Sequence, residues 1–297
     1  MNQIKIKECA ACLSQNVKHV MAISDHSISK ENFNISECGQ CGFRYTQDPP
    51  AEDYCGRYYQ SEDYISHSDT STGLIFTVYH WVRNIMLGRK YKLIQSLNGP
   101  KTLLDVGSGT GYFPAFMKDK GYEVMGIEVD DHARNYSQEK FGLNVKSPSD
   151  LKDGNIRERF GCITLWHVLE HLYQPDDYMK HFANLLTTDG HLIIAIPNFH
   201  SYDAAYYQQF WAAYDVPRHL WHFHPKAFEV FANRNGFAII RKESMPFDPF
   251  YNAMLSAKYK KSALGMVGGM WTGCLALLKG LFDVNKASSV IYVMKKM

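Results

Sequence analysis

An excess of charge of either sign is missing from this sequence. The 32 lysine and arginine residues are nearly balanced by 30 aspartate and glutamate residues, so the formal net charge of the 297-residue chain is only +2. Domains that bind nucleic acid usually show a clear basic excess, and we therefore expect no nucleic-acid partner. Partners must be inferred from individual sites.

A long apolar run is also missing near the start of the chain. The first ten residues, MNQIKIKECA, contain no apolar segment like that of a secretory signal peptide. We expect a cytoplasmic protein, whose seven cysteines stay reduced unless they bind a metal. The length and the 45% of apolar residues suffice for one large α/β domain and a small additional unit.

The most informative stretch that is present is 101–130, KTLLDVGSGTGYFPAFMKDKGYEVMGIEVD. It contains an apolar run that includes Asp105, a glycine-rich turn, a helical pattern and a second apolar run that ends at Glu128. Glycines let a ligand approach the backbone, while the amides that open the next helix point at the ligand. Glu128 is placed to accept hydrogen bonds from ribose hydroxyls. The stretch predicts the nucleotide-binding half of a doubly wound sheet.

The glycine spacing narrows the class of nucleotide. A dinucleotide-binding fingerprint needs glycine three positions after Gly109, where Tyr112 stands, and the third glycine comes one residue earlier, at Gly111. This G-x-G-x-G form, with an acid on each side, resembles motifs I and II of the class I S-adenosylmethionine-dependent methyltransferases. The resemblance implies S-adenosylmethionine as the cofactor. The predicted cofactor-binding residues are Asp105, Gly107, Ser108, Gly109, Gly111, Tyr112, Phe113, Glu128, Val129, Trp166 and His167.

Four cysteines form two C-x-x-C pairs, Cys9 with Cys12 and Cys38 with Cys41. Four thiolates at this spacing can close a tetrahedral zinc site, and zinc can hold together a module too small for its own core. The pairs resemble the zinc module of the sugar C-methyltransferases. We expect a structural zinc ion in a zinc-ribbon-like module over residues 1–50. A redox-active dithiol, or a site that has lost its metal, is the alternative.

Tyrosines are dense in the polar segment 54–69, and a helical pattern then runs from about 72 to 98. Residues 51–100 are therefore expected to form a helical connector. Aromatic side chains in such a segment pack either on the domain surface or over a ligand as a lid. Tyr59, Tyr64 and His67 are the lid candidates.

From residue 101 onward, short apolar runs alternate with helical patterns. The helical patterns are 131–141, 174–187 and 225–235, and the later apolar runs are 143–145, 162–167, 191–197, 237–242 and 289–295. This alternation predicts a parallel sheet with crossover helices. We expect a doubly wound, Rossmann-like α/β fold with a seven-stranded sheet over residues 101–297, in which a helical insert at 245–287 precedes the last strand.

The segments ITLWHVLEHL and DGHLIIAIPN make the resemblance more specific. They resemble the fourth- and fifth-strand motifs of bacterial class I methyltransferases from sugar, quinone and cell-surface biosynthesis, over roughly residues 9–244 and the last strand. This implies methyl transfer to a hydroxyl or carbon of a small or lipid-linked acceptor, in cell-surface glycan or quinone biosynthesis. The N/D-P-P-Y/F tetrapeptide of amino-methylating nucleic-acid enzymes is absent after the fourth run.

A hydroxyl or carbon acceptor needs a base. In the sugar C-methyltransferases a histidine-bearing segment follows the fifth strand, and His219 is its best match here, with Arg218 where those enzymes have an acid. The resemblance implies His219 as the catalytic base, with His171 and Tyr64 as further candidates. Arg218 would orient an anionic acceptor, and His222 and His224 are expected to be structural.

His167, Glu170 and His171 are spaced i, i+3 and i+4, which places them on one face if the chain is helical there. A comparable cluster in ubiquinone-type O-methyltransferases and small-RNA methyltransferases implies a divalent-metal site. A packing or cofactor-side role is the alternative.

Residues 262–278, SALGMVGGMWTGCLALL, carry no charge, and Gly265, Gly269 and Gly273 recur at four-residue spacing. The run is slightly shorter than the ~20 residues that span a bilayer. We expect either a buried helix packed closely on another helix, or peripheral membrane contact through residues 258–282 at the inner membrane face. A true span is the third alternative.

Two other classes of function are weighed against methyl transfer. An NAD-linked oxidoreductase is disfavoured by Tyr112. A catalytically inactive, zinc-dependent binding protein is disfavoured by the intact Gly107, Gly109 and Glu128.

Overall fold

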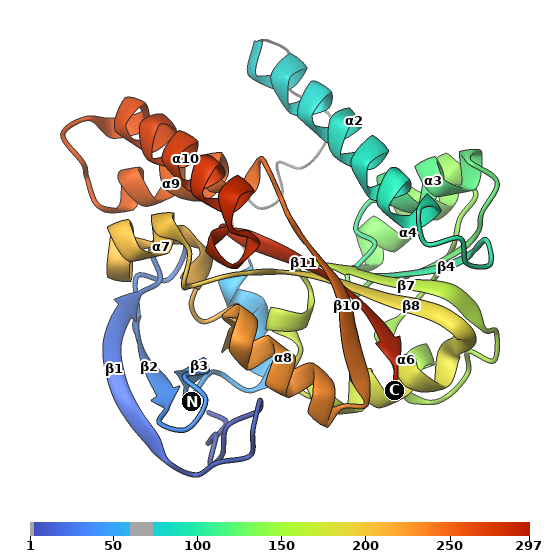
Figure 1. Cartoon of the computed structure of the whole chain (residues 1–297), viewed down its shortest axis with the longest axis horizontal. Helices are drawn as coiled ribbons and strands as arrows, with labels where there is room; N and C mark the ends of the chain where they lie inside the picture. Colours follow the sequence, from blue (N-terminus) through green and yellow to red (C-terminus); the bar gives the residue numbers. More distant parts are fainter. Residues whose placement is uncertain (1–2, 60–73) are drawn as a thin grey trace.

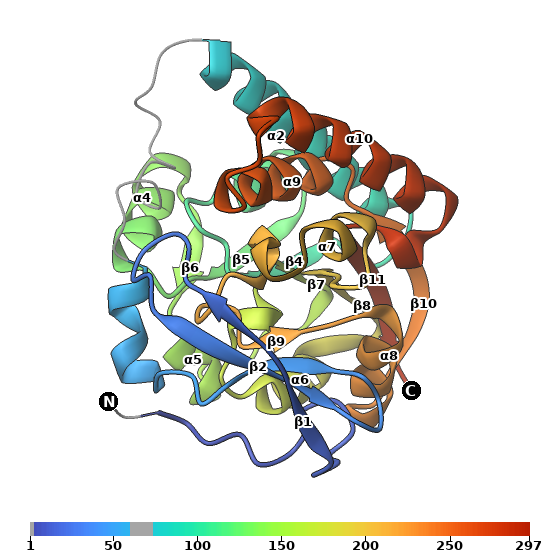
Figure 2. The same ribbon diagram turned by 90° about the vertical axis from the view of Figure 1, so that its left-hand side faces the viewer.

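The computed structural model describes residues 3–59 and 74–297 (Figure 1). Within these ranges the strands form a seven-stranded sheet and a four-stranded sheet. Helices flank the larger sheet, and the smaller sheet of the N-terminal segment lies in front of it in Figure 2.

The larger sheet is built from β4 (Thr102–Val106), β5 (Glu123–Ile127), β6 (Asn144–Lys146), β7 (Phe160–Trp166), β8 (Leu186–Pro197), β10 (Phe237–Ser244) and β11 (Ser289–Lys296). Its strand order is β10-β11-β8-β7-β4-β5-β6. The pairs from β6 to β8 are parallel, and β11 is antiparallel to both β8 and β10. The predicted seven-stranded, Rossmann-like sheet is confirmed.

The helices that precede and connect these strands pack on opposite faces of the sheet. They are α2 (Leu74–Gln95), α3 (Tyr112–Asp119), α4 (Asp131–Phe141), α5 (Pro148–Lys152), α6 (Pro175–Leu185) and α8 (Pro225–Arg234). Successive side chains of a strand point to opposite faces. Accordingly, Leu103 and Ile193 pack with α2 and α3, whereas Leu104 and Ile194 pack with α6 and α8.

The four-stranded sheet contains β1 (Val17–Ser24), β2 (Asn32–Cys38), β3 (Arg44–Gln47) and β9 (Trp221–His222), in that order. The first three strands belong to the N-terminal segment, which ends in the 3₁₀ helix η1 (Glu52–Tyr58). β9 comes from the segment after β8 and pairs with β3. The small sheet thus spans the boundary expected at residue 50, and Phe43 and Tyr45 share an apolar cluster with Trp221.

Short helices surround the carboxyl edge of the large sheet: η2 (Leu169–His171), α7 (Tyr202–Tyr207), η3 (Gln208–Phe210) and η4 (Ala212–Tyr214). The predicted insert between β10 and β11 is helical and consists of α9 (Asp248–Tyr259), α10 (Gly265–Phe282) and η5 (Val284–Lys286). Among the described helices, α10 is long and apolar enough, by length and composition alone, to cross a membrane, although 28% of it is buried inside the protein.

Candidate functional site

The glycine-rich loop lies at the carboxyl end of β4, where the chain switches faces of the sheet. α3 follows β4 on one face, and η2 and α6 follow the neighbouring β7 on the other. Ligands of doubly wound sheets bind in the crevice at such a switch point. Gly107 has a φ of +74°, and a Cβ there would lie 2.3 Å from the side chain of Val168. Only glycine fits this position.

Glu128 follows β5 and reaches back to the glycine loop. Its carboxylate accepts hydrogen bonds from the backbone amides of Gly109 (2.7 Å), Val129 (2.8 Å) and Asp130 (3.0 Å). Carboxylate oxygens retain further lone pairs, and a Cβ at Gly109 would meet no atom within 4 Å. The open space beside Gly109 and the carboxylate at its rim fit the ribose of a nucleoside cofactor.

The other predicted cofactor-binding residues near the loop differ in exposure and in what they contact. Ser108 is buried, and its hydroxyl has no hydrogen-bond partner among the described residues. A Cβ at Gly111 would lie 2.6 Å from Cβ of Ser137 in α4, so this glycine serves packing. Tyr112 lies under the guanidinium of Arg83, which is 3.9 Å from the ring centroid. Val129 is 76% exposed and contributes its backbone amide to Glu128.

Asp105 lies beneath the loop and is only 2% exposed. The hydroxyl of Thr164 in β7 donates a hydrogen bond to it at 2.6 Å. Burial raises the pKa of Asp105 to about 7, although this hydrogen bond and the charge of Lys90 oppose the shift. A cationic group of a ligand placed here would favour the ionised carboxylate.

Lys90 is a site residue that the sequence did not reveal. Its ammonium lies over the ring of Trp166 (4.1 Å to the centroid) and near that of Phe113 (5.1 Å), and the two rings pack edge to face. Burial lowers the pKa of Lys90 to about 8, against the opposing charges of Asp105 and Asp248. The residue belongs to α2 and is not part of any local motif.

His167 directly follows β7 and has a left-handed φ of +58°. Its Nε2 lies 2.8 Å from a carboxylate oxygen of Asp248 and its Nδ1 lies 3.3 Å from Glu170. Burial opposes the charge, but these carboxylates raise the pKa of His167 to about 10, so the imidazole is cationic. Asp248, the first residue of α9, was also missed by the sequence analysis, and it connects the insert to the site.

Two of the candidate catalytic residues lie together. The rings of His171 and His219 are 4.5 Å apart between centroids and nearly perpendicular. Nδ1 of His171 donates to the carbonyl of Arg218 (3.1 Å), and Nδ1 of His219 donates to the carbonyl of Ala213 (2.8 Å). In neutral imidazoles with these tautomers, Nε2 carries the lone pair. Burial and the neighbouring His219 lower the pKa of His171 to about 4, so it is neutral near pH 7.

The same cluster contains the metal-ligand types that were expected on one helical face, but in a different combination. Ligand atoms of Glu170, His171 and His219 all lie within 4.8 Å of one another. One carboxylate oxygen of Glu170 is buried without a hydrogen-bond partner in the described part of the chain. His167 contacts Glu170 through Nδ1, but its Nε2 is bound to Asp248, and His219 takes its place in the cluster. The arrangement could accept a proton or hold a divalent cation.

Arg218 does not face an acceptor site. Its guanidinium donates to Asp25, Asp215, Ser27 and the carbonyl of Tyr58, and the residue is 4% exposed. The hypothesis that it orients an anionic acceptor is therefore wrong, since its donors are already satisfied within the fold.

His222 and His224 are held within the fold as well. Nε2 of His222 lies 3.1 Å from the hydroxyl of Thr46, and Nε2 of His224 lies 3.1 Å from the carbonyl of Cys41. Both contacts join the segment after β8 to the N-terminal segment, which agrees with the structural roles expected for these histidines.

The four cysteines of the C-x-x-C pairs converge in the N-terminal module, and their sulfurs all lie within 4.8 Å of one another. Cys9 and Cys41 are 3.5 Å apart, and Cys12 and Cys38 are 3.6 Å apart, between sulfurs. Tetrahedral zinc with Zn–S bonds of about 2.3 Å places its sulfurs about 3.8 Å apart. The residues present therefore fit a zinc ion.

One of the three lid candidates can be placed. The hydroxyl of Tyr59 lies 3.3 Å from Nδ1 of His171, so the residue after η1 reaches the histidine pair. Tyr64 and His67 lie outside the described residues, and the proposed catalytic role of Tyr64 stays a prediction.

Comparison with known proteins identifies the family. A family described as "Methyltransferase domain" matches residues 80–242, more than half of the chain. A ubiquinone biosynthesis O-methyltransferase of Serratia proteamaculans is 28% identical over 105 residues, which cover 33% of this chain and 43% of the relative. An uncharacterized methyltransferase of Staphylococcus carnosus is 31% identical over 101 residues, or 33% of this chain and 48% of the relative. The chain spans about half the length of the curated relatives it matches.

Solved structures share the fold. Magnesium protoporphyrin IX methyltransferase from Synechocystis, with bound S-adenosylhomocysteine, has a TM-score of 0.52 at 12% identity and covers 81% of this chain and 97% of that one. A putative sarcosine dimethylglycine methyltransferase from Galdieria sulphuraria has a TM-score of 0.51 at 14% identity, covering 74% and 88%. The predicted class I S-adenosylmethionine-dependent methyltransferase fold is confirmed, and the chain belongs to the methyltransferase domain family.

Proposed function

We propose that this chain transfers the methyl group of S-adenosylmethionine to a hydroxyl or carbon of a small or lipid-linked acceptor, in cell-surface glycan or quinone biosynthesis. The observation that carries the proposal is the histidine pair at the carboxyl edge of the sheet, where Nδ1 of His171 and of His219 each donates to a backbone carbonyl and Nε2 keeps the lone pair. The partial match to ubiquinone biosynthesis O-methyltransferases supports a hydroxyl acceptor.

The residues of this chain have separate roles in the proposed reaction. Glu128 and the glycine loop hold the nucleoside, and S-adenosylmethionine, when bound, supplies an electrophilic methyl group. Nε2 of His219 accepts the proton of the acceptor as the new bond forms. The Glu170 carboxylate then stabilises the imidazolium, because its charge lies within the same buried cluster. Tyr59 closes the cluster on the side of the N-terminal segment.

We also propose that the chain binds a structural zinc ion and is located in the cytoplasm. The ion would be bound by Cys9, Cys12, Cys38 and Cys41 as a structural centre, away from the histidine pair. The reduced state that this site needs is the normal state of thiols in the cytoplasm.

Methyl-labelled S-adenosylmethionine tests the proposal. The full chain is incubated with a catechol, as a quinone-like acceptor, and with a polyprenyl-phosphate sugar, and labelled product is counted. His219→Ala should lower turnover by about 10²–10⁴-fold, with cofactor affinity nearly unchanged, because the lost interaction belongs to the transition state. His181→Ala, a half-buried histidine on α6, is the matched control.

Three results would overturn parts of the proposal. A melting temperature raised by NAD but not by S-adenosylhomocysteine would exclude S-adenosylmethionine as the cofactor. Full turnover by His219→Ala would show that His219 is not the catalytic base. Turnover abolished by EDTA and restored by Mg²⁺ would assign Glu170, His171 and His219 to a divalent cation instead of proton transfer.

A further inference from the structure

An unusually apolar surface lies on the helical insert. The side chains of α10 that face away from the protein include Met266 (74% exposed), Val267 (77%), Trp271 (68%) and Phe282 (88%). Leu264, Met270, Leu278 and Leu281 are exposed as well. We call these eight residues the hairpin surface. Single exposed apolar side chains are ordinary, but a contiguous patch of this kind marks an interaction site.

The other face of α10 packs mainly on its neighbour α9. A Cβ at Gly269 would lie 2.7 Å from Cα of Met254, and a Cβ at Gly273 would lie 3.0 Å from Cα of Phe250. The glycines therefore serve a close approach of two helices, which was one of the roles expected from their spacing. Because this face is packed, the hairpin surface cannot be buried by rotating the helix.

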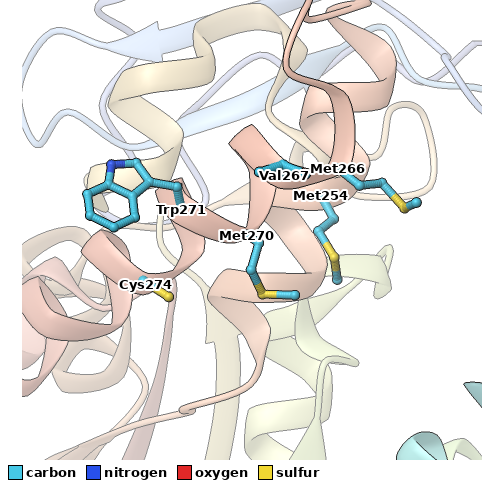
Figure 3. Close-up of a pocket in the computed structure, with 6 residues that line it drawn as sticks. All are labelled: Met254, Met266, Val267, Met270, Trp271 and Cys274. Atoms are coloured by element: carbon cyan, nitrogen blue, oxygen red, sulfur yellow. The ribbon is translucent and has the colours of Figure 1, made fainter.

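An open groove of about 470 Å³ lies beside the hairpin surface and is lined partly by its residues (Figure 3). It is lined by Met254, Met266, Val267, Met270, Trp271 and Cys274. Methionine side chains are flexible and adapt to irregular apolar partners. A lining of this composition suits hydrocarbon and offers almost no polar group for specific recognition.

Lysines precede and follow the apolar helix in the sequence. Residues 258–286 contain Lys258, Lys260, Lys261, Lys279 and Lys286, whereas Asp283 is their one acidic residue. All five lysines are exposed. Basic side chains around an apolar helix complement anionic lipid headgroups. A second copy of this chain would instead bring like charges together, which disfavours dimerisation through this surface.

The position of the hairpin agrees with attachment to a planar surface. In both views the α9–α10 hairpin and the first turns of α2 lie at the upper edge of the molecule (Figures 1 and 2). Trp81 in α2 is 62% exposed, and tryptophan favours the membrane–water interface. α9 begins at Asp248, which contacts His167 in the functional site. The hairpin is therefore joined directly to the functional site through the first residue of α9.

We infer that the hairpin surface docks on the anionic face of a lipid bilayer, with α10 lying in the interface rather than spanning it. A spanning α10 would have to leave α9, and its packed glycine face would lose that partner. This inference concerns membrane attachment and holds whichever acceptor is methylated.

Vesicle sedimentation tests the inference with the full chain. Binding is measured on phosphatidylcholine vesicles and on vesicles with about one third phosphatidylglycerol. The chain should bind the anionic vesicles, and binding should weaken at high salt. Met266→Glu with Trp271→Glu should abolish binding. Lys258→Gln, Lys260→Gln and Lys261→Gln together should weaken it by about 100-fold, since each surface lysine contributes about fivefold.

Matched controls carry the same change in charge elsewhere. Tyr54→Glu with Ile240→Glu, at residues 55% and 50% exposed, should leave binding unchanged. The same holds for Lys101→Gln, Lys120→Gln and Lys226→Gln, all at exposed positions outside the hairpin. Melting curves and S-adenosylhomocysteine binding verify that every variant is folded.

Two outcomes would overturn the inference. One is the absence of binding to anionic vesicles, or equal loss in hairpin and control variants. The other is a wild-type dimer by light scattering that Met266→Glu with Trp271→Glu dissociates, because a second copy would then cover the surface. No acceptor or turnover enters the test, so its failure is separate from failure of the proposed methyl transfer.

Discussion

The guanidinium of Arg218 donates hydrogen bonds to the carboxylates of Asp25, at 3.0 Å, and Asp215, at 2.7 Å. It thereby connects the N-terminal segment to the loop that carries His219. Burial alone would raise the pKa of Asp25, but the hydrogen bonds of Arg218 and of backbone amides hold it well below its usual value. The N-terminal module therefore positions the candidate base through a buried ion pair.

Removing the arginine should destabilise the whole protein. Arg218→Met leaves the buried Asp25 and the half-buried Asp215 without their cation, and we expect a loss of about 3–5 kcal/mol in the free energy of unfolding. Urea denaturation measures it. Arg241→Met, at a half-exposed ion pair with Glu243, should cost less than about 1 kcal/mol. Adding Asp25→Asn to Arg218→Met should recover part of the loss. A cost of Arg218→Met no larger than that of the control would contradict a stabilising role.

The sequence predicts the large sheet well because its signals are local. The run 101–130 contains strand, glycine turn, helix and strand in order, and β4, α3 and β5 lie within it. The last strand was expected at 289–295 and is observed at Ser289–Lys296. β9 could not be predicted, since two residues carry no periodic pattern and their partner β3 lies far away in the sequence.

In the candidate site, too, the sequence predicts the residues that belong to local motifs and misses those that do not. The glycine loop and Glu128 lie within one βαβ unit, so their spacing is visible in the sequence. Lys90 and Asp248 reach the site from a helix before the first strand of the large sheet and from a helix between its last two strands, without a motif. Arg218 was assigned to the acceptor because its partner Asp25 is 193 residues away, and only the folded chain shows that its charge is already neutralised.

Glu128 should determine cofactor affinity. Glu128→Ala removes the carboxylate proposed to accept hydrogen bonds from the ribose, and we expect S-adenosylmethionine binding to weaken by about 1.5–3 kcal/mol. Isothermal titration calorimetry measures the change. Glu123→Ala, at the exposed start of the strand that Glu128 follows, is the control and should bind normally. Equal affinity of Glu128→Ala and wild type would refute the assignment.

The cysteine cluster should hold about one zinc ion per chain. Elemental analysis of the purified protein should find it, and Cys9→Ser or Cys38→Ser should lose it, because each removes one of four ligands. Cys274→Ser changes a cysteine outside the cluster and should retain the metal. A metal-free wild-type protein of unchanged stability would contradict the prediction.

Asp105 should make the stability of the cofactor-free protein fall as the pH rises. Its pKa is raised to about 7 by burial, from about 3.9 in the unfolded chain. A group with a raised folded pKa contributes stability that is fully present below the unfolded value and is lost as the pH passes the folded value. Between pH 5 and pH 8 the wild type should thus lose stability, by at most about 3 kcal/mol for the two pKa units between pH 5 and the folded pKa, whereas Asp105→Asn should lose less.

Cofactor binding should lower the raised pKa of Asp105. The ammonium group of S-adenosylmethionine near Asp105 would favour the ionised carboxylate, so binding at pH 6 should release a proton. Calorimetry in two buffers with different ionisation enthalpies measures that release. Asp105→Asn cannot release it, and the two buffers should then give the same binding enthalpy. If wild type and Asp105→Asn show the same pH profile and the same proton release, Asp105 is already ionised in the free protein, and its interaction with Lys90 outweighs its burial.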